Sequence, residues 1–189
     1  MKKILLISGS NRNGNTNYLL KQIEQKIDNT ELILLSKCNI EYCKGCLACH
    51  EIYKCVIKDD INEIINKIKE ADLIIFGVPN YFDNVSGLFK NFKDRLHPLY
   101  KSELIKNKNV IFSFTGGGGE DGTLEEMQKS VRGLIKYLKL NVLKNYSYKA
   151  LNLHDVEIQK EKINNMIEEI KKLSESKKYN RKNICDDFE

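Results

Sequence analysis

Short hydrophobic runs recur along the chain and predict the strands of a buried sheet. Four runs are almost continuously hydrophobic, which is typical of strands that are covered on both faces. They lie at Ile4–Ile7, Leu32–Leu35, Leu73–Val78 and Val110–Phe114. A weaker run lies at Val142–Leu151. The pattern therefore predicts five strands.

Between these runs, hydrophobic residues recur every three or four positions, which is the period of an amphipathic helix. Asp60 with Glu63, and Thr123 with Glu126, match the capping pattern at the start of a helix. The helices are expected within Thr16–Ile27, Ile61–Ile68, Ser86–Leu96, Thr123–Leu138 and Ile163–Leu173. This alternation predicts an α/β fold with a doubly wound, five-stranded parallel sheet and helices on both faces.

One segment interrupts the alternation. Residues 37–58 lie between the second strand and its helix, and they hold most of the cysteines. The length of 189 residues fits one domain. We expect a single domain over residues 1–173 with a cysteine-rich loop at 37–58, followed by a polar tail at 174–189.

Charge and hydropathy exclude several classes of partner. The hydrophobic run after Lys3 is too short for the core of a signal peptide, and no run approaches the ~20 residues that span a bilayer. We therefore expect a cytoplasmic protein without a membrane partner. The net charge is +5, from 31 basic and 26 acidic residues, and the basic residues form no aromatic-lined face. Nucleic-acid binding is not expected.

The loop after the first strand is rich in hydroxyl and amide groups and leads directly into a helix. It lacks the G-x-G-x-x-G pattern of dinucleotide sites. Gly9 and Gly14 have the spacing of a P-loop, but Asn15 and Thr16 stand where that loop needs Lys and Ser or Thr. A helix N-terminus with the cation of Arg12 suits a phosphate monoester. A polar loop that only caps the helix is the alternative.

Two further loops leave the same edge of the predicted sheet, where ligands bind in folds of this kind. The segment Pro79–Ser86 sets an aromatic pair, Tyr81 and Phe82, beside amide side chains. In the segment Thr115–Gly119, a threonine is followed by four glycines, which allow the backbone to approach a flat ligand closely. Together the loops offer a phosphate cradle, an aromatic wall and free backbone N–H groups.

These three loops, in this order, resemble those of the NADPH-dependent FMN reductase family. The segment Cys-Lys-Gly-Cys-Leu-Ala-Cys and the stretch that follows Cys55 resemble the iron–sulfur flavoprotein branch of that family. The likeness extends from about Met1 to Leu151, with Asn11 standing where many relatives have proline. It implies a flavodoxin-like fold, bound FMN, NAD(P)H as electron donor, and a homodimer or homotetramer.

The resemblance also assigns cofactor-binding residues by position, and it assigns no catalytic side chain. The phosphate would lie against Ser10, Arg12, Asn15, Thr16 and Asn17. The isoalloxazine ring would lie against Pro79, Asn80, Tyr81, Phe82 and Asn84, and its pyrimidine edge against Thr115, Gly116, Gly117 and Gly118.

Four of the six cysteines, Cys43, Cys46, Cys49 and Cys55, follow one another at spacings that favour one [4Fe–4S] cluster. Zinc sites usually separate two short cysteine pairs by a dozen residues or more. Ferredoxin runs end in Cys-Pro, whereas Val56 follows here, and a redox dithiol needs only one C-x-x-C. The resemblance supports a cluster, while zinc, a dithiol and free thiols stay open.

The remaining cysteines and histidines are expected to play no part in binding iron. Cys38 and Cys185 stand apart from the group and are not expected to be ligands. His50 is a neighbour of Cys49, and it is expected to be a solvated loop histidine rather than part of the site. We expect the cluster at the carboxyl edge of the sheet, beside the flavin.

The function expected from these observations is that of an FMN-dependent oxidoreductase. It would take electrons from NAD(P)H and pass them through the flavin, and through a [4Fe–4S] cluster, to an acceptor. A flavodoxin-type electron carrier is one alternative, although such carriers are generally acidic and this chain is at +5. A plain FMN reductase without a cluster and a thiol or metal sensor are others.

Overall fold

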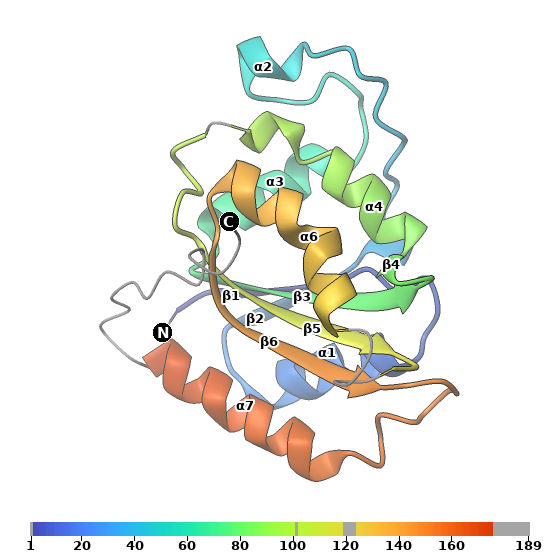
Figure 1. The fold of residues 1–189 in the computed structure, drawn as a ribbon. Helices are drawn as coiled ribbons and strands as arrows, with labels where there is room; N and C mark the ends of the chain where they lie inside the picture. Colours follow the sequence, from blue (N-terminus) through green and yellow to red (C-terminus); the bar gives the residue numbers. More distant parts are fainter. Residues whose placement is uncertain (1, 101, 119–123, 176–189) are drawn as a thin grey trace.

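A central parallel sheet organises the chain, as Figure 1 shows. The computed structural model describes residues 2–100, 102–118 and 124–175. The strands have the order β2-β1-β3-β5-β6, and every neighbouring pair in this order is parallel. Their bounds are β1 Ile4–Ser8, β2 Thr30–Leu34, β3 Leu73–Tyr81, β5 Asn109–Gly116 and β6 Asn141–Lys149. The order is that of flavodoxin-like folds, so the predicted fold class is confirmed.

Helices cover both faces of the sheet. Helices α1 (Asn15–Lys26) and α7 (Lys160–Glu175) lie on one face. Helices α3 (Ile61–Glu70), α4 (Gly87–Asp94) and α6 (Leu124–Leu138) lie on the other. Because side chains alternate along a strand, Leu5 and Ile7 of β1 join the α3–α4–α6 core, whereas Ile4 and Leu6 join the α1–α7 core. This two-sided burial explains why the strands are hydrophobic almost throughout.

The third strand is longer than predicted. It continues through Pro79 to Tyr81 and turns back into β4 (Asn84–Val85), which pairs with it antiparallel. Phe82 and Asp83 form the turn with φ angles of 51° and 54°. Positive φ at both central residues defines the type I′ turn of a tight hairpin. The prediction of five strands thus missed a sixth, of two residues.

The segment boundaries differ from the predictions in several small ways. Leu35 belongs to the 3₁₀ turn η1 (Leu35–Lys37) rather than to β2. The cysteine loop contains a short helix, α2 (Cys49–Ile52), and a 3₁₀ turn, η2 (His97–Leu99), follows α4. The predicted cap at Thr123 lies outside the described residues, as does Cys185. Within the described parts of the chain, we find no helix with the length and hydrophobicity to cross a membrane.

Helix α4 is anchored by aromatic packing. The ring of Phe76 on β3 meets Phe89 edge to face at 5.8 Å between centroids and lies 6.5 Å from Phe92. Phe76 also stacks on Phe112 of β5, at 5.2 Å between centroids. Both α4 rings are completely buried. The helix is therefore fixed against the centre of the sheet, and the segments at its two ends are held with it.

Helix α1 packs closely on β3 at Gly77, and this packing generates a testable prediction. A Cβ atom at Gly77 would lie 2.8 Å from side-chain carbons of both Thr16 and Leu20. Overpacking of this kind costs about 1–3 kcal/mol. Gly77→Ala should lower the free energy of unfolding in urea by that amount.

Gly87→Ala is the matched control, because a Cβ at Gly87 meets nothing within 4 Å. It should leave stability unchanged or raise it by up to about 1 kcal/mol. Equal unfolding free energies for the two variants would contradict the close contact between α1 and β3.

Candidate functional site

The carboxyl ends of β1, β3 and β5 bring the three predicted loops together. The backbone N–H of Gly9 donates to the carbonyl of Gly77 at 2.8 Å, which joins the first loop to β3. The hydroxyls of Thr16 and Thr115 lie 2.6 Å apart and are buried, which joins α1 to the end of β5. Ser86 donates to the carbonyl of Gly9 at 2.7 Å. The loops thus form one continuous surface.

The first loop is held in shape by its own polar side chains. The hydroxyl of Ser10 and the amide of Asn17 both donate to the carbonyl of Arg12, at 2.9 and 3.1 Å. Ser10 and Asn17 are buried, whereas Arg12 is exposed. Helix α1 begins after Gly14 with no side-chain cap and no acidic residue in its first turn. An exposed cation and an uncapped helix terminus therefore lie together, as an anion requires.

Asn15 has a structural role that the sequence did not predict. Its side chain donates to the carbonyl of Asn152 at 2.7 Å and accepts from the backbone N–H of Val156 at 3.2 Å. Both ends of the amide are thus engaged by the segment between β6 and α7. That segment is thereby held beside the first loop.

The second loop presents aromatic rings and a buried acceptor. At the hairpin tip, Phe82 is fully exposed and Tyr81 is 44% exposed. Below them, Oδ1 of Asn80 is buried and accepts no hydrogen bond from the described residues. Buried polar atoms are rarely left unpaired, so this oxygen marks a place where a donor from a ligand would fit. Asn84 is engaged locally, accepting from the N–H of Val85 at 2.8 Å.

The third loop needs glycine where it passes the second loop and the segment that follows β6. A Cβ at Gly116 would lie 2.7 Å from the Cβ of Asn80, and one at Gly117 would lie 2.7 Å from Leu151. Contacts this short do not occur for real side chains, so larger residues would push the loops apart. Gly118 is exposed, and Gly119 lies outside the described residues.

The four clustered cysteines line one small cavity. The cavity has a volume of about 80 Å³, and its wall includes the four residues Cys43, Cys46, Cys49 and Cys55. The side chain of Asn62 makes two hydrogen bonds to the backbone of Cys55. It donates to the carbonyl at 2.9 Å and accepts from the N–H at 3.0 Å. These bonds bring the fourth thiol back to the first three.

The cavity is set back from the edge where the three loops meet, whereas the sequence predicted the four cysteines at that edge. Asp94, at the C-terminal end of α4, contributes to its wall, whereas Ser86, at the N-terminal end, contacts the first loop. The eight residues of α4 span about 12 Å. In Figure 1 the cysteine loop with α2 lies beyond α4, away from the sheet.

Cys38 is not among the residues that line this cavity. Its thiol lies 3.5 Å from the carbonyl of Leu34, and burial raises its pKa. Burial also raises the pKa of the Cys49 thiol, and the neighbouring cysteines add to that rise.

A buried ion pair, which the sequence analysis missed, supports the cavity. The guanidinium of Arg95 meets both carboxylate oxygens of Asp59, at 2.7 and 3.0 Å, and the two side chains are 1% and 0% exposed. The same guanidinium donates to Sγ of Cys55 at 3.2 Å and to the carbonyl of Glu41. One signal was available: Arg95 follows Phe89 and Phe92 at helical spacing, on the hydrophobic side of α4.

The ion pair changes the acidity of both groups. Burial by itself would raise the pKa of Asp59, but hydrogen bonds from Arg95 and from the N–H groups of Glu41 and Ile61 lower it below its ordinary value. Burial would lower the pKa of Arg95, and the bonds to Asp59 and Cys55 raise it instead. Both groups are therefore charged at neutral pH.

His97, which lines the cavity, pairs with His50. Nε2 of His50 lies 2.8 Å from Nδ1 of His97, and the rings stack at 4.6 Å between centroids. The Cys49 sulfur is 3.8 Å from the same Nδ1. His50 thus has a ring partner, rather than only solvent, and His97 was not singled out from the sequence.

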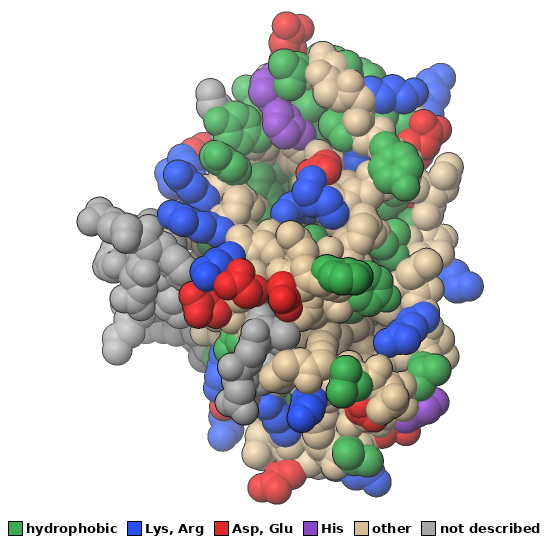
Figure 2. All heavy atoms as spheres, turned by 45° about the vertical axis from the view of Figure 1, so that its right-hand side comes forward, with side chains coloured by type: hydrophobic (Ala, Val, Ile, Leu, Met, Phe, Trp, Pro, Cys, Tyr) green, Lys and Arg blue, Asp and Glu red, His purple; other side chains and the backbone are tan. Residues whose placement is uncertain are grey.

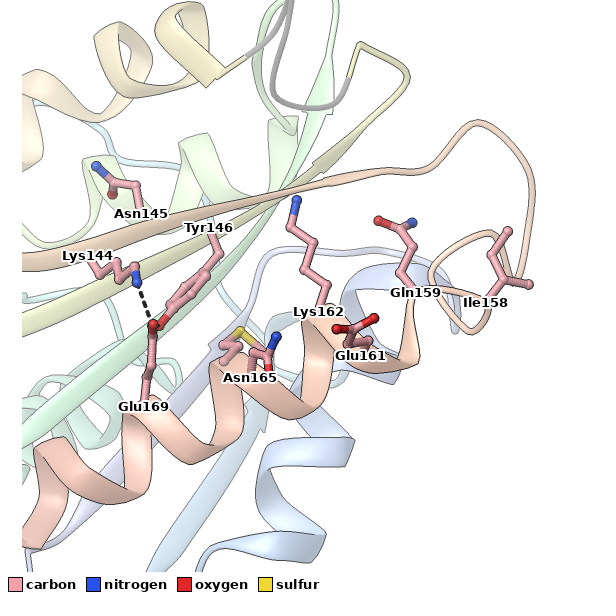
Figure 3. A pocket seen from close by; sticks show the side chains of 10 residues that line it. Lys144, Asn145, Tyr146, Ile158, Gln159, Glu161, Lys162, Asn165 and Glu169 are labelled. Carbon is pink, nitrogen blue, oxygen red and sulfur yellow. Dashed lines mark hydrogen bonds and ion pairs between the residues drawn. The ribbon is translucent and has the colours of Figure 1, made fainter.

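A larger hollow of about 560 Å³ lies between β6 and α7 (Figure 3). Its wall is built only from β6, α7 and the segment between them. Lys144 and Glu169 form an ion pair across it at 2.6 Å, and Tyr146 also donates to Glu169. None of the predicted cofactor residues lines this hollow, so we assign no cofactor to it.

Two similar proteins are named as iron–sulfur flavoproteins. The chain is similar to an iron–sulfur flavoprotein of Methanocaldococcus jannaschii, with 38% identity over 133 residues, 66% of this chain and 69% of the relative. It is similar to an iron–sulfur flavoprotein of Clostridioides difficile, with 40% identity over 111 residues, 54% of this chain. That alignment spans about half of the relative, 49%.

Solved structures share the fold at low sequence identity. An NAD(P)H:quinone oxidoreductase from Methanothermobacter marburgensis superposes with a TM-score of 0.72 at 14% identity, covering 95% of this chain and 99% of that one. An FMN-dependent NADH-azoreductase from Bacillus anthracis, in complex with FMN, gives 0.61 at 15% identity, with coverages of 91% and 99%.

The sequence pattern of the NADPH-dependent FMN reductase family matches residues 2–154, which include all three loops and the cysteine segment. With this match, the strand order and the convergence of the loops, the chain belongs to the NADPH-dependent FMN reductase family of oxidoreductases.

Proposed function

We propose that this enzyme takes electrons from NAD(P)H through FMN, and that Cys43, Cys46, Cys49 and Cys55 hold a [4Fe–4S] cluster. The observation that carries the proposal is the single cavity of about 80 Å³ that all four thiols line, in a chain of an FMN reductase family. When bound, FMN would accept a hydride and the cluster would transfer single electrons to an acceptor.

The residues of the first loop fit a phosphate group. Arg12 would supply the positive charge, and the N-terminus of α1 would supply backbone N–H groups. Ser10 and Asn17 would act by fixing the loop backbone at Arg12, and Asn15 and Thr16 by holding neighbouring segments beside it.

The other two loops fit a flat ring system. Asn80 has a buried oxygen that could accept from a ring N–H, and Tyr81 and Phe82 offer aromatic surface. Pro79 and Asn84 would complete this wall, and Thr115 to Gly118 would present backbone groups to the pyrimidine edge.

The thiol spacing and the named relatives favour iron over zinc. Cuboidal clusters take one cysteine for each iron, and three of the ligands here follow at successive intervals of three residues. The names of the similar proteins from M. jannaschii and C. difficile describe iron–sulfur flavoproteins. A plain FMN reductase, with zinc or free thiols in the loop, is the second candidate.

The cysteine loop carries apolar side chains that are exposed in the single chain. They gather at the top of Figure 2, over the loop seen in Figure 1. They are Tyr42, Leu47, Ile52, Tyr53 and Val56, which are between 51% and 79% exposed. Exposed apolar side chains that gather in one region are typical of an interface. We infer a homodimer or homotetramer in which this loop contacts another copy.

Sedimentation velocity tests the inferred oligomer. The protein should sediment as a dimer or tetramer, and replacing exposed Leu47 and Ile52 with serine should favour the monomer, because apolar burial drives association. Leu104→Ser, which removes a leucine that is 68% exposed outside the loop, is the control. A monomeric wild-type protein at micromolar concentration would contradict the inference.

The Arg12 assignment is tested by titrating apoprotein with FMN. Arg12→Ala should weaken binding about ten- to a hundredfold, because a charge-assisted hydrogen bond contributes roughly 1.5–3 kcal/mol. Lys21→Ala is the control, since it removes a half-buried lysine of α1 whose ammonium contacts Asn13. An unchanged dissociation constant for Arg12→Ala would exclude this loop as the phosphate site.

The cluster is tested by Cys→Ser variants prepared without oxygen and reconstituted with FMN, iron and sulfide. Each change at Cys43, Cys46, Cys49 or Cys55 should remove about four iron atoms per chain and the cluster absorption. Cys38→Ser should keep both. NADH or NADPH should still bleach the flavin band in all of them.

Zinc in place of iron, or four fully reactive thiols in reconstituted wild-type protein, would defeat the cluster and leave the plain reductase. Failure of both nucleotides to reduce the flavin would contradict the donor assignment instead.

A further inference from the structure

We propose that Arg95 tunes the reduction potential of the cluster through its hydrogen bond to Cys55, and that Asp59 positions Arg95 for this task. The inference rests on the proposed function, since it assumes that the four cysteines hold the cluster. It assigns Arg95 and Asp59 as positioning residues, because both act through the Cys55 ligand.

The position of Arg95 is unusual for a charged residue. Among the residues that the structure describes, it is the only charged one buried as a whole residue, at 1% exposure. A buried charge is costly unless it is paired and hydrogen-bonded. Helix α4 has an exposed side that would accept an arginine freely, as it accepts Lys90. The requirements of helix α4 therefore do not explain why Arg95 is buried beside the thiols.

The donor groups of Arg95 are divided between the ion pair and the cavity. One Nη group reaches Asp59 and the carbonyl of Glu41, and the other reaches Asp59 and Sγ of Cys55. The Nε–H is buried and has no acceptor among the described residues, although Arg95 lines the cavity. A cluster would bring further sulfur acceptors into that cavity.

The sulfur contact has a defined effect on an electron equilibrium. A cluster held by the four cysteines would be reduced by one electron that comes from NAD(P)H through FMN, [4Fe–4S]²⁺ + e⁻ → [4Fe–4S]⁺, with no bond formed or broken. The added negative charge is shared with the cysteine sulfurs. A fixed cation that donates to Cys55 stabilises the reduced form more than the oxidised form, and so raises the potential.

Asp59 holds the guanidinium of Arg95 in place, but its own charge has the opposite electrostatic effect on the Cys55 sulfur. Its two oxygens fix both Nη groups, while its negative charge offsets part of the field of Arg95 at the sulfur. An asparagine in its place keeps an acceptor for Arg95 and removes the negative charge. The two residues therefore predict shifts of opposite sign.

Redox titration of the anaerobic holoprotein, followed by the electron paramagnetic resonance signal of the reduced cluster, tests this. In Arg95→Gln the ratio of reduced to oxidised cluster at a fixed potential should fall about tenfold, which is 59 mV for a one-electron couple. In Arg95→Lys this ratio should fall less, because lysine keeps the positive charge but lacks the planar guanidinium group. In Asp59→Asn the ratio should rise.

Lys44→Gln is the matched control, because it removes a cation whose side chain is 70% exposed on the same loop. Solvent screens such a charge, so its effect should be much smaller than that of Arg95→Gln. The midpoint potential of FMN in each variant is an internal reference and should not move.

Arg95→Ala is avoided as a test, because it would leave Asp59 buried without its partner. If Arg95→Gln fails to fold by circular dichroism, Arg95→Lys and Asp59→Asn decide the question by the signs of their shifts.

The outcomes separate this inference from the proposed function. A wild-type protein that holds no iron overturns the cluster itself. A loaded wild-type protein whose cluster potential is unchanged in the Arg95 and Asp59 variants leaves the proposed function standing and overturns the tuning role. Folded Arg95 variants that never hold iron also overturn it, since Arg95 would then serve assembly alone.

Discussion

The ion pair between Arg95 and Asp59 fixes the cysteine loop to the rest of the molecule. The loop has little hydrophobic packing of its own, and most of its residues between Glu41 and Lys58 are exposed. Its base is held by polar contacts instead: Asp59 accepts from the N–H of Glu41 at 2.9 Å, and Arg95 donates to the carbonyl of the same residue. A buried ion pair can therefore hold the base of a loop that has little hydrophobic packing.

Helix α4 relates the two sites to each other. Ser86 caps the helix by accepting from the N–H of Phe89 at 3.1 Å and also ties it to the first loop. Phe89 and Phe92 fix its middle against the sheet, and Arg95 follows its last turn. A site built on a rigid element keeps its geometry better than one built on loops alone. Here both candidate sites contact the same helix, so the length of α4 sets the spacing between them.

The strands could be predicted well from the sequence, because a strand that is covered on both faces of the sheet is hydrophobic at nearly every position. The gathering of the four cysteines around one cavity could be expected for a similar reason, since residues close in sequence lie close in space. The hairpin at Phe82 was missed, because Pro79 suggests the end of a strand and nothing in Phe-Asp announces a type I′ turn. Arg95 was missed because its burial depends on Asp59, 36 residues away, and no local pattern records that pairing.

Phe82 is not the residue type that best stabilises the backbone conformation of the hairpin turn. A left-handed conformation is easy for glycine or asparagine and unfavourable for a large aromatic residue. Phe82 adopts it with φ of 51°, and its ring is nevertheless fully surrounded by water in the single chain. Neither local conformation nor burial within the monomer accounts for phenylalanine there. An exposed phenylalanine at the tip of the hairpin fits the proposal that this ring offers aromatic surface to a bound flavin.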